Sequence, residues 1–74
     1  MSMVNPEATT KDLMRLAADH GQKRITLSDE DKALLISLLK QRAQDELDYG
    51  QEIECETVRV VRRVTGAVGV YFNT

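Results

Sequence analysis

Apolar residues recur every three or four positions over the first two thirds of the chain, which is the spacing of amphipathic helices. The first such stretch predicts a helix over residues 6–20, capped by Asn5 and with Pro6 in its first position. Thr9 is a second candidate for the cap. We expect Gly21 to end this helix, because glycine adopts the left-handed conformation that often follows a last helical turn.

A second periodic stretch predicts a longer helix over residues 29–49. Ser28 is its expected cap, three acidic residues follow where the helix dipole favours negative charge, and Gly50 is the expected stop. Its apolar stripe consists of Leu35, Leu38, Leu39, Ala43 and Leu47. Leu34 and Ile36 widen this stripe, so we expect the first turns of the helix to be covered from two sides.

β-branched residues dominate the last third of the chain and favour strands. Acidic and apolar or small residues alternate over positions 52–57, and Thr65-Gly66 is a candidate turn between two later strands. The same segment also fits helical spacing, so a third helix over residues 52–65 stays open as an alternative. We prefer a small antiparallel sheet formed mainly by residues 52–73.

These elements predict one α+β domain over residues 1–74, with two helices packed on the sheet and with residues 1–5 flexible. Residues 23–27 alternate in polarity and predict a brief strand or an extended connector. Cores of this size seldom contribute more than about 3–5 kcal/mol, so we expect a homodimer or a stabilising partner. Strand addition at an unpaired sheet edge would serve either purpose.

The composition excludes several classes of protein. Of the 74 residues, 42% are apolar and 30% are charged, which is typical of a folded domain, and the formal net charge is -2, whereas nucleic-acid-binding domains are usually basic. No apolar run reaches the roughly 18–20 residues of a membrane span, and no signal peptide opens the sequence. A single cysteine cannot form an intramolecular disulfide, which fits a reducing cytoplasm.

Groups suited to catalysis are few. His20 is the only histidine, and its place in the last turn of the first helix favours an interaction of its charge with the helix dipole. Cys55 lies between glutamates that disfavour a thiolate, so we interpret it as a small apolar filler. A zinc site usually needs three or four protein ligands close together. We therefore expect no catalytic residues, no metal, no cofactor and no enzymatic activity.

Positive charge and aromatic side chains gather near the end of the chain. No acidic residue follows position 56, whereas arginines follow it and two of the three aromatic residues lie next to the C-terminus. The aromatic side chains either close the core or anchor a partner. Our candidate partner-binding residues are Arg59, Arg62, Arg63, Tyr71 and Phe72.

The leading functional hypothesis is a small non-catalytic protein-binding regulator, inhibitor or adaptor. It would act in the cytoplasm on a larger machine, which is bacterial or targeted by a phage. The alternative is a nucleic-acid-binding regulator whose C-terminal arginines contact phosphates. Association with a membrane is not expected.

A short segment resembles a known type of loop. Val60-Val61-Arg62-Arg63-Val64-Thr65-Gly66, followed by Phe72-Asn73, is similar to the loop around the radical-bearing glycine of anaerobic ribonucleotide reductases and related glycyl-radical proteins. In that family an aromatic residue generally follows the glycine, whereas Ala67 follows here. The resemblance implies, as a third hypothesis, an accessory protein of glycyl-radical type with the radical on Gly66.

Overall fold

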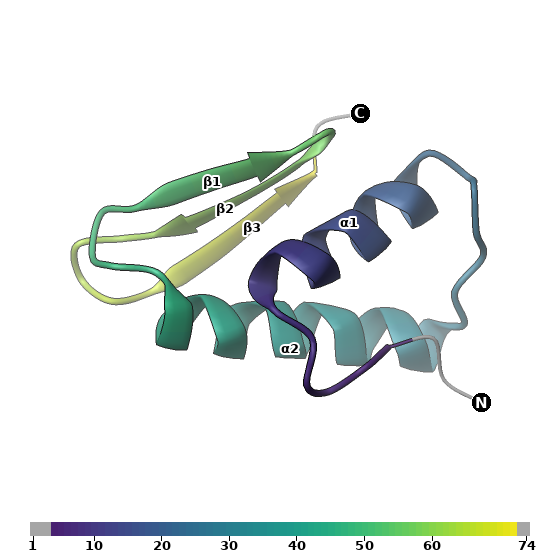
Figure 1. Cartoon of the computed structure of the whole chain (residues 1–74), viewed down its shortest axis with the longest axis horizontal. Helices are drawn as coiled ribbons and strands as arrows, with labels where there is room; N and C mark the ends of the chain where they lie inside the picture. Colours follow the sequence, from purple (N-terminus) through teal and green to yellow (C-terminus); the bar gives the residue numbers. More distant parts are fainter. Residues whose placement is uncertain (1–3, 73–74) are drawn as a thin grey trace.

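Two helices precede three strands along the chain, and both helices pack on the same face of the sheet that the strands form (Figure 1). The computed structural model describes residues 4–72. Its elements are α1 (Thr10–Gly21), α2 (Asp29–Glu46), β1 (Glu52–Cys55), β2 (Val58–Arg62) and β3 (Val68–Phe72). The strands are antiparallel in the order β1-β2-β3. This arrangement confirms the predicted α+β fold and the strand interpretation of the last third.

Helix α1 begins later than predicted. Its cap is Thr9, whose Oγ1 accepts a hydrogen bond from the backbone N–H of Asp12 at 3.2 Å. The prediction of a start at residue 6 is wrong because the side chain of Asn5 accepts a hydrogen bond from the N–H of Glu7 at 3.0 Å. That local bond favours a turn over a helix. Thr9 was the second candidate for the cap.

The end of α1 is a Schellman motif. The N–H of Arg24 donates to the carbonyl of Asp19 at 2.9 Å, and the N–H of Lys23 donates to the carbonyl of His20 at 3.0 Å. Lys23 has a φ of 62°, so it occupies the left-handed position that glycine usually fills. The prediction that Gly21 takes this conformation is therefore wrong, since Gly21 is the last residue of the helix itself.

Residues 23–27 form a connector rather than a strand. Leu27 is buried in the core, and its backbone N–H donates to Nδ1 of His20 at 3.3 Å. His20 thus ties the connector to α1 through a hydrogen bond, and it lies in the last turn of α1, as predicted.

Helix α2 confirms its predicted cap and ends earlier than predicted. Oγ of Ser28 accepts a hydrogen bond from the N–H of Asp31 at 3.1 Å. The helix ends at Glu46 because Leu47 adopts an extended conformation and is buried in the core. The chain then turns at Gly50, which has a φ of 82°, and enters β1.

Two short turns connect the strands. Glu56 and Thr57 join β1 to β2, and Glu56 has a φ of 53°, which is uncommon for a residue with a side chain. The second turn contains Gly66, whose φ is 95° and whose N–H donates to the carbonyl of Arg63 at 2.8 Å. The sequence therefore predicted the second turn correctly and did not indicate the first.

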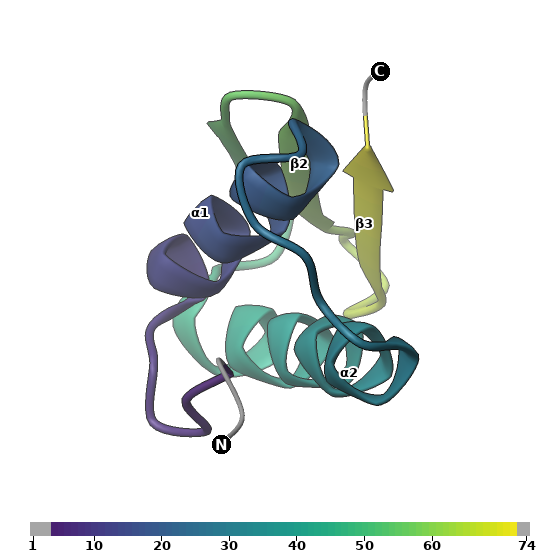
Figure 2. The same cartoon turned by 90° about the vertical axis from the view of Figure 1, so that its right-hand side faces the viewer.

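The core lies between the helices and the inner face of the sheet. Figure 2 shows both helices on this side, with α1 packed against β1 and β2 and with α2 beneath β3. The largest fully buried side chains of the core are those of Leu13, Met14, Leu39, Val58 and Val60. Leu34 remains 41% exposed, so the expectation of cover from two sides is wrong at that position. Within residues 4–72, no helix is both long and apolar enough to span a membrane.

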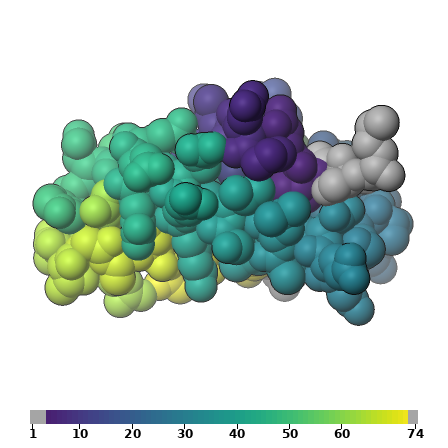
Figure 3. All heavy atoms as spheres, turned by 90° about the horizontal axis from the view of Figure 1, so that it is seen from below, coloured from purple at the N-terminus to yellow at the C-terminus, as the bar shows by residue number. Residues whose placement is uncertain are grey.

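The first described residues, from Val4 onward, lie beside α2 in the space-filling view (Figure 3). Val4 is 4% exposed within the core cluster, and the guanidinium of Arg42 donates to the carbonyl of Pro6. The segment predicted to be flexible, residues 1–5, lies partly outside the described residues. The predicted sheet boundary at Asn73 also lies outside them.

Candidate functional site

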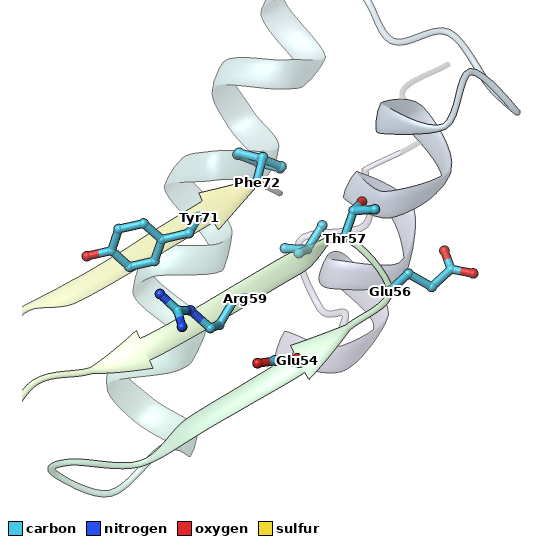
Figure 4. A pocket seen from close by; sticks show the side chains of 7 residues that line it. Glu54, Glu56, Thr57, Arg59, Tyr71 and Phe72 are labelled. Atoms are coloured by element: carbon cyan, nitrogen blue, oxygen red, sulfur yellow. The ribbon is translucent and has the colours of Figure 1, made fainter. Parts of the chain in front are cut away.

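The outer face of the sheet, which neither helix covers, carries several of the candidate residues. The strand register places Arg59 of β2 between Glu54 of β1 and Tyr71 of β3. Side chains of directly paired residues project from the same face of a sheet. Figure 4 shows these three side chains on adjacent strands. The fold therefore brings together two candidates, Arg59 and Tyr71, that lie far apart in the sequence.

Arg59 interacts with both neighbouring strands. Its guanidinium carbon lies 5.2 Å from the centroid of the Tyr71 ring, which is within the range of a cation–π contact. Its Nη1 lies 3.7 Å from a carboxylate oxygen of Glu52 on β1. Both side chains of this ion pair are nearly half exposed, so the pair contributes only about 0–1 kcal/mol to stability. A carboxylate from another molecule can replace Glu52 at little cost.

Arg63 lies just after β2 and also contacts Tyr71. Its guanidinium donates a hydrogen bond to the Tyr71 hydroxyl. Among residues 4–72, Arg63 forms no ion pair with a carboxylate. Arg59, Arg63 and Tyr71 are called the arginine–tyrosine cluster below. In this cluster the charge of Arg59 is paired with Glu52 and that of Arg63 is not paired with a carboxylate of the described residues. The third member, Tyr71, is 38% exposed.

Arg62 points to the opposite face of the sheet and contacts the end of α2. Its guanidinium donates to the backbone carbonyls of Gln44, Leu47 and Gly66. It also lies 4.7 Å from the centroid of the Tyr49 ring. These carbonyls include two near the C-terminal end of α2 that lack partners within the helix. Arg62 therefore caps a helix, and its Nε and Nη1 donate to carbonyls of its own chain.

Phe72 lies at the end of β3 beside a second surface feature. It is 49% exposed, so it does not close the core, which was one of the two expected roles of the terminal aromatics. An apolar groove of about 320 Å³ runs past it between the two helices. The groove is lined by Ala17, His20, Gly21, Lys32, Leu35, Ile36 and Phe72. No local sequence pattern predicts this groove, because its walls come from α1, α2 and β3.

A hollow of about 340 Å³, with both polar and apolar side chains in its lining, lies where the β1–β2 turn meets the end of β3 (Figure 4). Its lining includes Glu54, Arg59, Tyr71 and Glu56. Glu56 also accepts hydrogen bonds from Arg24 at 3.1–3.2 Å. Hydrogen bonds to Asp19 and Glu56 raise the pKa of the Arg24 guanidinium above its ordinary value. This exposed ion pair links the turn to the segment that follows α1.

The remaining candidate groups lie apart from this face. Cys55 is partly buried against the core, and Gly66 lies in the β2–β3 turn beside the Tyr49 ring. No group of three or more potential metal-binding side chains occurs among residues 4–72.

Sequence reasoning missed Gly69, which shapes the arginine–tyrosine cluster. A Cβ at this position would lie 2.7 Å from Cε2 and from the hydroxyl of Tyr71. The spacing of Gly69 and Tyr71 on one face of a strand was the only available signal.

Comparison of the chain with protein-family models, with curated proteins and with solved structures finds no match.

Proposed function

We propose that this chain is a small non-catalytic protein-binding module that acts as a regulator, inhibitor or adaptor. It engages its partner through the outer face of the sheet. The main support is Arg63, which bonds to the Tyr71 hydroxyl and has no carboxylate partner in the described part of the chain. A partner carboxylate can fill that place with two parallel hydrogen bonds.

The arginine–tyrosine cluster has the character of an interface site. Arginine and tyrosine are enriched at protein interfaces and among the residues that contribute most to affinity. Here the Tyr71 ring is held between two guanidinium groups and lies across Gly69. Because the ring is already held in place, binding requires less loss of side-chain freedom.

The distribution of charge favours a protein partner over a nucleic acid. Arg62 donates to carbonyls of its own chain, so only Arg59 and Arg63 remain of the three candidate arginines. Glu52 and Glu54 lie on the neighbouring strand. Nucleic-acid-binding surfaces usually gather more positive charge than this. The single free cysteine supports a reducing compartment such as the cytoplasm.

The test is reversal of charge in the cluster. We compare the wild type with the double variant Arg59→Glu/Arg63→Glu and with a matched control, Lys11→Glu/Lys40→Glu, which makes the same change in net charge at exposed sites on the helices. Each protein is used for affinity capture from its native lysate. Captured proteins are quantified by mass spectrometry, and the most enriched one is purified for binding measurements.

We expect the control to bind the purified partner like the wild type, and the double variant to bind at least about tenfold more weakly. Circular dichroism checks that all three proteins fold. Equal binding by the folded double variant would contradict the proposal. Duplex DNA and single-stranded RNA are tested in parallel at low and moderate salt. Binding to them that falls steeply with salt and is lost in the double variant would favour a nucleic-acid-binding regulator instead.

A further inference from the structure

We infer that β3 is a docking edge for an extended acidic segment of the partner protein, which joins the sheet as a fourth strand. This inference rests on the proposed function and specifies how the partner binds. β3 pairs with β2 on one side only. Figure 2 shows it at the margin of the molecule, with no other described segment beyond it. Addition of a strand to such an edge is a common mode of peptide recognition.

The register shows which backbone groups of β3 are free. The N–H of Arg63 donates to Ala67 on the β3 side, whereas the N–H of Arg62 donates to Gln51 on the β1 side. Hydrogen-bonded and non-hydrogen-bonded pairs alternate along antiparallel strands. The pairs of β2 with Gly69 and Tyr71 are therefore the hydrogen-bonded ones. The backbone N–H and C=O groups of the alternate β3 residues, Val68, Val70 and Phe72, point away from the sheet.

The two edges of the sheet differ: β1 carries charges that oppose the addition of another strand, and β3 carries none. β1 carries Glu52 and Glu54, and charged side chains on an edge strand oppose unspecific addition of another strand. β3 has the sequence Val-Gly-Val-Tyr-Phe, with no charge and no proline. An unprotected apolar edge of this kind is a liability unless a partner pairs with it. β3 is therefore the edge suited to accept a strand.

Charge selects the kind of strand that fits. On the outer face, an added strand would lie beside Tyr71, with Arg59 and Arg63 close behind it. No acidic residue occurs after position 56 to balance these arginines from the β3 side. A second copy of the chain, paired through its own β3, would bring the same arginines and no acidic side chain from that strand. An acidic segment from another protein matches this face better than a second copy does.

The inner face of the same edge favours apolar side chains. Phe72 borders the apolar groove that also contains Leu35 and Ile36. Side chains of an added strand alternate between the two faces. The favoured partner segment therefore alternates acidic residues, directed to the arginine–tyrosine cluster, with apolar residues directed to the groove. Lys32 lies at the groove and offers a further contact for a terminal carboxylate.

The experiment selects peptides from a random displayed library on the immobilised full chain. The most enriched peptide is then synthesised, and its affinity is measured for the wild type, Val70→Pro and Val70→Ala. Proline at position 70 removes an N–H that points away from β2, and it thereby blocks addition of a strand without removing a bond of the β2–β3 ladder. Alanine shortens the same side chain and keeps the N–H, so it is the matched control.

We expect enriched peptides that alternate acidic and apolar residues, with binding at least about tenfold weaker for Val70→Pro and nearly unchanged for Val70→Ala. In the wild type, peptide binding should slow amide exchange at Val68 and Val70, a readout that does not depend on the proline variant folding. Failure to enrich a peptide, selection of another pattern, equal binding by folded Val70→Pro, or unchanged amide exchange at both positions would each overturn the inference.

Two outcomes separate this inference from the proposed function. If Arg59→Glu/Arg63→Glu no longer binds the natural partner while folded Val70→Pro binds it as tightly as the wild type, strand addition is overturned and the proposed function stands. If both folded variants bind the partner as tightly as the wild type, the inference and the proposed function are both overturned. Sedimentation measures whether a second copy of the chain, instead of another protein, pairs with the β3 edge. A wild-type dimer that becomes a monomer in Val70→Pro would assign the edge to self-association and overturn the inference.

Discussion

The ring of Tyr71 lies directly across Gly69, two residues earlier on the same face of β3. A Cβ on residue 69 would come within 2.7 Å of Cε2 and of the hydroxyl of Tyr71, a distance that real Cβ atoms do not tolerate. The absence of a side chain at Gly69 is therefore what lets the ring take the position in which Arg59 contacts its face and Arg63 bonds to its hydroxyl. A residue without a functional group of its own thus determines the geometry of the arginine–tyrosine cluster.

Replacement of Gly69 by alanine should displace the Tyr71 ring and leave the fold intact. The φ of Gly69 is not positive, so the backbone accepts alanine there, but the added methyl group occupies the space of the ring. The measurement is the chemical shifts of the Tyr71 ring protons, made in a Tyr49→Phe background in which Tyr71 is the only tyrosine. We expect clear shifts with a change in stability of less than about 1 kcal/mol. An unchanged ring spectrum would contradict the arrangement.

Arg62 and Arg63 are neighbours in sequence and should differ strongly in their effect on stability. Arg62 donates to three backbone carbonyls, whereas Arg63 contacts the exposed Tyr71 hydroxyl. We expect Arg62→Ala to lower the free energy of unfolding by about 2–3 kcal/mol, because hydrogen bonds from a charged group are lost and helix carbonyls lose their donor. Arg63→Ala should change it by no more than about 0.5 kcal/mol. Urea denaturation compares the two, and equal losses would refute the capping role.

This contrast also shows what the sequence can and cannot predict. Period-two spacing predicts that Arg59 and Arg62 project from opposite faces of a strand, and they do. Spacing does not say which face the helices cover, since that depends on packing between distant segments. The capping role of Arg62 requires the end of α2 beside β2, and no local pattern indicates it. The candidate site was therefore predicted as a list of residues, but not as a geometry.

Residue preferences for caps and turns predicted the local structure correctly where the preferred residue type is present. They failed where a residue of another type occupies the position. Ser28 is a typical helix cap, and the structure confirms it. The left-handed position after α1 and the first hairpin turn are filled by Lys23 and Glu56, which carry none of the usual glycine or asparagine signal. In both cases the ends of neighbouring elements fix the conformation. Glu56 also accepts hydrogen bonds from Arg24, just after α1.

Replacement of Lys23 by glycine should stabilise the protein. The φ of 62° strains a lysine, whereas glycine adopts this conformation freely. We expect the free energy of unfolding to rise by about 0.5–1 kcal/mol, after the larger entropy loss of glycine is included. The matched control is Lys40→Gly in the middle of α2, which should lower it by about 1 kcal/mol. A loss of stability in Lys23→Gly would show that the lysine side chain contributes more than the strain costs.

Glu46, the last residue of α2, should stabilise the start of α1. One of its carboxylate oxygens accepts hydrogen bonds from the backbone N–H of Thr10, at 2.7 Å, and from the Thr10 hydroxyl. Thr10 is only 2% exposed, so removal of the carboxylate leaves buried donors without this acceptor. We expect Glu46→Ala to lower the free energy of unfolding by about 1–2 kcal/mol.

The control for Glu46 is Asp45→Ala. It removes a neighbouring carboxylate whose contact with Arg42 is a long and exposed one of 4.0 Å. The expected loss is no more than about 0.5 kcal/mol, since exposed ion pairs contribute little. A negative charge at the C-terminal end of α2 opposes its dipole, so both substitutions remove an unfavourable interaction within α2. A larger loss in Glu46→Ala than in Asp45→Ala must therefore come from α1. Equal losses in the two variants, measured by urea denaturation, would contradict the bridge between the helices.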